Sequence, residues 1–96
     1  MSGDEEFRVA CGARLRRVRN ALGFPIRRAF AKALQVDENT LQKWENGAAL
    51  VPPAFTQRLK ELWQISHDYI YGGDPSGLPQ RLHTALLDEE QRKREA

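Results

Sequence analysis

The stretch Gly23–Gly47, GFPIRRAFAKALQVDENTLQKWENG, decides how this chain folds. Its pattern of apolar residues predicts two short helices, about 26–34 and 38–46, joined by a tight turn. Asp37 is a good N-cap for the second helix, and Gly47 is typical of the residue that ends one. A helix-turn-helix unit is therefore expected in the first half of the chain.

The second helix of this unit has an unusually polar outer face. The spacing of Leu41 and Trp44 predicts that these two side chains point inward. The remaining positions carry groups that can hydrogen-bond to base edges: Glu38, Asn39, Thr40, Gln42 and Lys43. Amides pair with adenine, a carboxylate accepts from cytosine and lysine donates to guanine. This face suits the floor of a DNA major groove, the alternative being a merely solvated helix face.

Four further helices are expected around this unit, at about 7–22, 53–63, 67–71 and 78–96, with no strand-like alternation anywhere. The fold class is therefore all-α. We expect a disordered acidic start at 1–6, a compact domain over 7–73, and a linker followed by an amphipathic helix over 74–96. The helical periods assign to the core Leu15, Val18, Leu22, Phe30, Ala31, Leu34, Leu41, Trp44, Phe55, Leu59, Leu62, Trp63, Tyr69 and Ile70.

Size and composition restrict the class of protein. Ninety-six residues make one small domain, and no apolar run reaches the ~18–20 residues of a membrane span. No signal peptide opens the chain, whose first residues are acidic. The single Cys11 excludes an internal disulfide. A cytoplasmic protein is expected.

Charge is distributed unevenly. The net charge is only +2, but residues 7–71 carry eleven Lys or Arg against five Asp or Glu, and the rest carry four against eight. The body of the domain is thus basic and its two ends are acidic. This distribution favours a polyanionic partner that contacts one face of the domain.

No arrangement of residues indicates catalysis or metal binding. His67 and His83 have no cysteine or acidic cluster at ligand spacing. Ser66-His67-Asp68 is better explained by a serine N-cap than by a catalytic triad. Gly72–Gly77, GGDPSG, lacks the lysine of a phosphate-binding loop. We therefore expect no enzyme, no metal and no cofactor.

Three pieces of the chain carry a resemblance to a known family. They are Leu15–Arg19 (LRRVR), Thr40–Gly47 (TLQKWENG) and Ile65–Gly73 (ISHDYIYGG), in that order. Together they resemble the lambda-repressor-like helix-turn-helix family, the Cro and phage-repressor (XRE) type. The resemblance implies a compact five-helix domain with its motif at 27–46, here followed by a sixth helix.

The resemblance also implies roles for individual residues. The positions that resemble base contacts are Glu38, Asn39, Gln42 and Lys43. Those assigned to phosphate contacts are Arg19, Arg27, Arg28, Thr40 and Asn46. An ion pair between Arg19 and Glu45 is expected to tie the first helix to the recognition helix.

The chain departs from the family pattern at several positions. Arg27 replaces the usual glutamine, and Gln35 and Gln64 stand where a left-handed glycine is common. The segment 48–51, AALV, is apolar where many relatives carry lysine and arginine.

These observations predict a sequence-specific, double-stranded-DNA-binding transcriptional regulator, most simply a repressor. Such a protein would be prokaryotic or phage-encoded and nucleoid-associated. A homodimer is expected, and the apolar stripe at 78–87 either forms its interface or packs on its own domain. One alternative is a module of the same fold that recognises a protein partner through the apolar segment 48–55. A further variant is an antitoxin, which would bind both DNA and a partner toxin.

Overall fold

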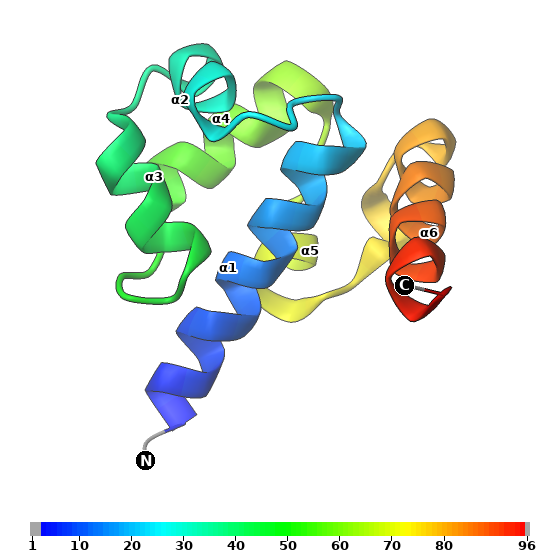
Figure 1. Ribbon diagram of the computed structural model, residues 1–96, viewed down its shortest axis with the longest axis horizontal. Helices are drawn as coiled ribbons and strands as arrows, with labels where there is room; N and C mark the ends of the chain where they lie inside the picture. Colours follow the sequence, from blue (N-terminus) through cyan, green and yellow to red (C-terminus); the bar gives the residue numbers. More distant parts are fainter. Residues whose placement is uncertain (1–2, 96) are drawn as a thin grey trace.

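The computed structural model describes the backbone of residues 3–95 and the side chains of residues 3–88. This part of the chain is all-α, as expected, with α1 (Gly3–Ala21), α2 (Arg27–Leu34), α3 (Glu38–Glu45), α4 (Pro53–Trp63), α5 (His67–Gly72), the 3-10 helix η1 (Pro75–Gly77) and α6 (Gln80–Glu95). In Figure 1, α1 runs through the middle, with α3 on one side and α6 on the other. Among the described residues, no helix combines the length and apolarity needed to cross a bilayer.

The turn between α2 and α3 is built by local hydrogen bonds. Gln35 ends α2 in the left-handed conformation, with φ at 59°, and its N–H donates to the Lys32 carbonyl. Asp37 then caps α3, because its Oδ2 accepts from the Asn39 N–H at 3.1 Å. Gln64 ends α4 in the same left-handed way, with φ at 61°. Both positions thus adopt the conformation for which glycine is common, at the cost of some backbone strain.

One continuous core joins all six helices. Leu15 and Val18 of α1 meet Phe30 of α2, Leu41 of α3 and Leu59 of α4. Other buried apolar members are Ala31, Leu34, Trp44, Val51, Ile65, Tyr69, Ile70, Leu78, Leu82 and Leu86. The expectation for Leu62 was wrong: its side chain is exposed, because α4 turns Leu59 and Trp63 toward the core instead.

The N-terminal segment differs from the expectation of disorder. α1 begins at Gly3, and Asp4, Glu5 and Glu6 form its first turn. Carboxylates at this end of a helix interact favourably with the backbone dipole, which explains why an acidic sequence is helical here. Residues 1 and 2 lie outside the described part of the chain.

The last helix packs on its own domain. Leu78, Leu82 and Leu86 are all buried in the common core, and α6 lies along α1. The segment expected to be a linker contains η1, capped by Asp74, whose Oδ1 accepts from the Ser76 N–H at 3.0 Å. Of the two alternatives for 78–87, the structure therefore shows the stripe packed on its own domain, and a homodimer stays a prediction.

Candidate nucleic-acid interface

The outer face of α3 presents four side chains to solvent. Glu38, Asn39, Gln42 and Lys43 are all exposed, while Leu41 and Trp44 on the inner face are buried. Within the described residues, none of the four outer side chains makes a hydrogen bond or an ion pair. Two amides, a carboxylate and an ammonium group are thus available for contacts outside the chain. These are the groups that read base edges in a major groove.

A buried carboxylate fixes the orientation of α3. Glu45 Oε2 accepts from Arg19 Nε at 2.8 Å, and Oε1 accepts from Arg19 Nη2 at 3.3 Å. Arg27 Nε donates to Oε1 from α2 at 3.1 Å. Arg19 Nη1 also donates to the carbonyls of Phe24 and Pro25. Glu45 therefore joins α1, α2 and α3 at one point, in the arrangement expected for the Arg19–Glu45 pair.

The end of α3 rests directly on the backbone of α1. A Cβ added to Gly12 would lie 2.6 Å from the Glu45 carbonyl oxygen and would also collide with that of Trp44. Arg16 Nη2 donates to the Glu45 carbonyl at 2.9 Å, and Arg8 Nε donates to the Gly47 carbonyl at 3.1 Å. Arg16 thus binds the carbonyl of the last residue of α3, at the negative end of the helix dipole, and Arg8 binds the loop that follows the helix.

Of the five residues assigned to phosphate contacts, four have side chains that reach the surface. Arg28 is exposed at the start of α2, and the Arg27 side chain keeps 30% of its surface exposed beside its bond to Glu45. Thr40 is half-buried, and Asn46 is exposed, although its Oδ1 accepts from the Ala48 N–H at 3.0 Å. These four side chains reach the surface.

Arg19 does not fit the expected phosphate contact. It is 6% exposed, and its guanidinium donates to Glu45, Phe24 and Pro25 within the chain. Its role is to hold α1, the connection to α2 and α3 together, and the expectation of a phosphate contact is wrong for this residue.

The apolar segment 48–55 is only partly included in the core: Val51 is buried, and Ala49 and Phe55 pack against the core while partly exposed. The Val51 carbonyl accepts from the Tyr71 hydroxyl at 2.7 Å. The Phe55 ring lies 4.7 Å from that of Trp44, and the Arg58 guanidinium covers it at 4.5 Å. Leu50 is the large apolar side chain of this segment that stays exposed, at 40%. Part of the apolar composition is thus explained by packing against Trp44 of α3, and a protein partner at 48–55 stays a prediction.

Sequence reasoning missed two residues that position α3. Gly12 and Arg8 lie in the first helix, on the face that meets the end of the recognition helix. A glycine inside a helical pattern is the available signal, because it marks a place where another backbone approaches closely. Among the described residues, no cluster of histidine, cysteine or acidic side chains could hold a metal ion.

The comparisons with known proteins agree with this geometry. No curated protein and no solved structure matches the chain. A family model described as a helix-turn-helix domain matches residues 10–68, which contain α2, α3, α4 and most of α1. Helix-turn-helix domains bind DNA and are typically not enzymes. This match spans more than half of the sequence, and the chain belongs to the helix-turn-helix domain family.

Proposed function

We propose that this protein is a sequence-specific transcriptional regulator, a repressor, that places α3 in the major groove of double-stranded DNA. The observation that carries the proposal is the unpaired outer face of α3, made by Glu38, Asn39, Gln42 and Lys43. Direct readout requires side chains with unused donors and acceptors, held on a helix that can enter the groove. Each good pair with a base contributes ~1–3 kcal/mol of discrimination.

Phosphate contacts supply affinity and set the position of the helix on the duplex. We assign this role to Arg27, Arg28, Thr40 and Asn46, which reach the surface near the ends of α2 and α3. Arg27 donates to Glu45 through Nε, and 30% of its side-chain surface stays exposed, which supports a contact with phosphate. Each phosphate neutralised lowers log K by ~0.9 per tenfold increase in salt.

Two copies are expected to act together, because one recognition helix reads only ~4–5 base pairs. The surface between them is not the stripe of α6, which is buried within one chain. An operator for such a pair would be an inverted repeat with half-sites one helical turn apart.

The test is selection from a random double-stranded DNA pool at ~150 mM salt, which weakens purely electrostatic binding. An enriched inverted repeat would support paired readout, and a single enriched half-site would support readout by one copy. Absence of any enriched sequence, with binding that disappears as salt rises, would refute direct readout.

A matched pair of variants locates the readout on α3. Gln42→Ala should weaken binding to the selected sequence by ~1–3 kcal/mol and relax preference at one base pair. Gln80→Ala changes the same residue type on α6, on the other side of α1 (Figure 1), and should bind as the parent does. Equal losses in the two variants would contradict the assignment of α3.

A further inference from the structure

Arg58 of α4 reaches the turn of the helix-turn-helix unit. Its Nη1 donates to the Leu34 carbonyl at 2.6 Å and, at a longer distance of 3.4 Å, to the Gln35 carbonyl. Leu34 is the last residue of α2, and Gln35 is the left-handed residue that follows it. Carbonyls at the end of a helix have no partner within the helix, and a cation there also interacts favourably with the helix dipole. One guanidinium on α4 thus holds the end of α2 and the start of the turn.

The same guanidinium is connected to α3 through two aromatic rings. It lies over the Phe55 ring, 4.5 Å from the ring centroid. The Phe55 ring is in turn 4.7 Å from the ring of Trp44, which is buried on the inner face of α3. A planar guanidinium can stack on a ring and donate hydrogen bonds at the same time, whereas a lysine ammonium group has no flat face for stacking. Arg58 therefore contacts the turn directly and α3 through Phe55.

The helix that carries Arg58 is a fixed support. Leu59, its neighbour in the chain, is fully buried in the core. Thr56 is also fully buried, and its hydroxyl donates to the Pro53 carbonyl at 3.0 Å and lies 2.7 Å from His67 Nδ1. Because α4 is anchored on both the core and α5, its contact with the turn fixes the turn relative to the rest of the domain.

The turn determines how the two proposed sets of DNA contacts lie relative to one another. Arg27 and Arg28 at the start of α2 are assigned to phosphates, and the outer face of α3 is assigned to bases. The bond between Arg27 and Glu45 fixes the start of α2 against the end of α3, while Arg58 fixes the opposite end of α2. Base edges are read only if the side chains of α3 come within hydrogen-bond distance when the phosphates are bound.

We propose that Arg58 is a positioning residue for DNA readout, which holds α2 and α3 at the angle that lets phosphate and base contacts form together. This inference rests on the proposed function, but the arrangement of the turn can be measured without DNA. Loss of the Arg58 contacts lowers the fraction of chains whose turn is in the binding-competent arrangement, and the apparent affinity falls by that fraction. Non-specific binding depends on phosphates alone and tolerates the change.

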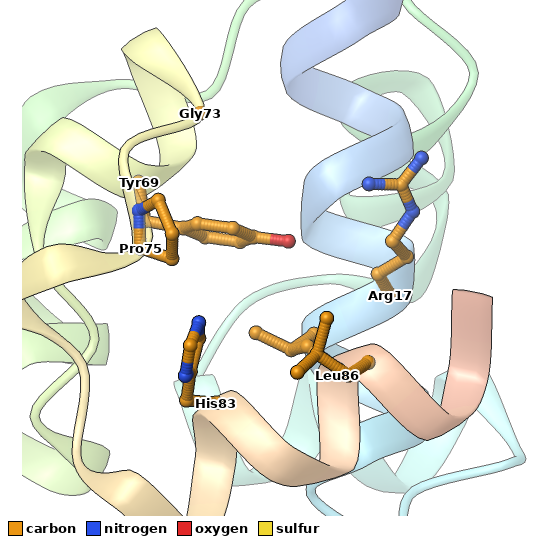
Figure 2. A pocket seen from close by; sticks show the side chains of 7 residues that line it. Arg17, Tyr69, Gly73, Pro75, His83 and Leu86 are labelled. Carbon is orange, nitrogen blue, oxygen red and sulfur yellow. The ribbon is translucent and has the colours of Figure 1, made fainter. Parts of the chain in front are cut away.

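The far side of α1 supplies a control. Figure 2 shows the cavity that lies there, lined by residues of α1, α5 and α6 that include Arg17, Tyr69 and His83. Arg17 and Tyr69 already interact within the molecule. α6 is on the other side of α1 from α3 (Figure 1). Arg81→Gln, at an exposed position of α6, therefore removes the same charge as Arg58→Gln on a helix remote from the reading face.

The first measurement uses amide NMR of the full chain without DNA. Arg58→Gln should shift the amide resonances of Gln35, Val36 and Asp37, because the carbonyls of the turn lose a charged donor. Arg58→Lys should return these resonances part of the way to their parental positions, since an ammonium group can still donate to the Leu34 carbonyl. Arg81→Gln should leave them unchanged.

The second measurement compares binding to the sequence selected from the random pool with binding to an unrelated duplex of the same length. It is made well below the unfolding temperature of every variant. Arg58→Gln should weaken binding to the selected sequence by about tenfold more than Arg81→Gln does, and Arg58→Lys should recover part of this loss. Binding to the unrelated duplex should change equally in the two glutamine variants. A role in stability alone would lower the unfolding temperature without changing the ratio of the two affinities.

The outcomes separate this proposal from the proposed function. Parental resonances of the turn in Arg58→Gln would overturn the contact between Arg58 and the turn. Shifted resonances with an unchanged ratio of the two affinities would overturn the positioning role. A parent protein that prefers no sequence would refute the proposed function and the positioning role with it, whereas the NMR result would still show whether Arg58 holds the turn.

Discussion

Replacing Glu45 by glutamine should destabilise the domain more than any other single change of charge. The carboxylate is fully buried and accepts from Arg19 at 2.8 and 3.3 Å and from Arg27 at 3.1 Å. Glutamine keeps the shape but removes the negative charge, and its amide nitrogen can only donate where a guanidinium also donates. Arg19, which is 6% exposed, would then be a buried cation without its counter-charge.

The magnitude follows from this geometry. Removing one partner of a buried ion pair costs ~3–5 kcal/mol. Arg19 keeps its bonds to the carbonyls of Phe24 and Pro25, so the lower end, ~3 kcal/mol, is expected. A domain of this size has a total stability of ~5–15 kcal/mol. At ~4–8 °C per kcal/mol, Tm should fall by ~12–24 °C.

The measurement is urea unfolding followed by far-UV circular dichroism. Glu61→Gln makes the same change on the exposed face of α4 and should stay within ~0.5 kcal/mol of the parent. The deficit of Glu45→Gln should persist at high salt, because buried pairs are screened little. The double variant Arg19→Met, Glu45→Leu should recover much of the loss by removing both charges. A loss below ~1 kcal/mol, or one that disappears at high salt, would refute the description of Glu45 as a buried anchor.

Three further results are expected. Gly12→Ala should cost ~3 kcal/mol or more in urea unfolding, because the added Cβ meets the backbone carbonyls at the end of α3. Gln35→Gly should raise Tm, because it relieves ~1 kcal/mol of left-handed strain, partly offset by unfolded-state entropy. Cys11 is fully buried, and burial raises the pKa of its thiol, so the neutral form is favoured at mildly alkaline pH. Iodoacetamide should therefore alkylate the folded protein far more slowly than the chain in urea.

Each of these three has a control on the same chain. Ala substitution at Gly3, where an added Cβ meets nothing within 4 Å, should leave stability unchanged. Gly substitution at Gln57, inside α4, should lower Tm where Gln35→Gly raises it. Equal stability of the Gly12 and Gly3 variants would contradict the close approach of α3 to α1. A lower Tm for Gln35→Gly would contradict the strain at Gln35. Equal alkylation of the folded and the unfolded protein would contradict the burial of Cys11.

The helix-turn-helix unit could be predicted from sequence because its signals are local. Asp37 caps α3 and Pro53 begins α4 as the sequence indicates, and Leu41 and Trp44 lie at the spacing of a buried face. Such signals depend on a few neighbouring residues and on the period of the helix. The boundaries of α2 to α5 accordingly lie within one residue of expectation.

Contacts between segments that are distant in the chain could not be predicted from sequence in the same way. An amphipathic stripe such as Leu78, Leu82 and Leu86 predicts burial but does not say whether the covering surface belongs to the same chain. The same limit applies to Arg19, because an arginine that reaches phosphate and one that neutralises a buried carboxylate look alike in sequence. Only the position of Glu45 in space separates the two roles.

The placement of these contacts explains how so short a helix is held in a fixed position. α3 has eight residues, too few to be stable in water by itself. Its inner face packs on the core, and the buried Glu45 carboxylate is bound by Arg19. Arg16 binds the Glu45 carbonyl at the end of the helix, and Arg8 binds the Gly47 carbonyl in the loop that follows. None of these contacts uses the outer side chains, and within residues 3–88 all four of them are without a hydrogen bond or ion pair. Because the helix is ordered before it meets a ligand, binding costs less conformational entropy, and substitutions on the outer face should change specificity without changing the fold.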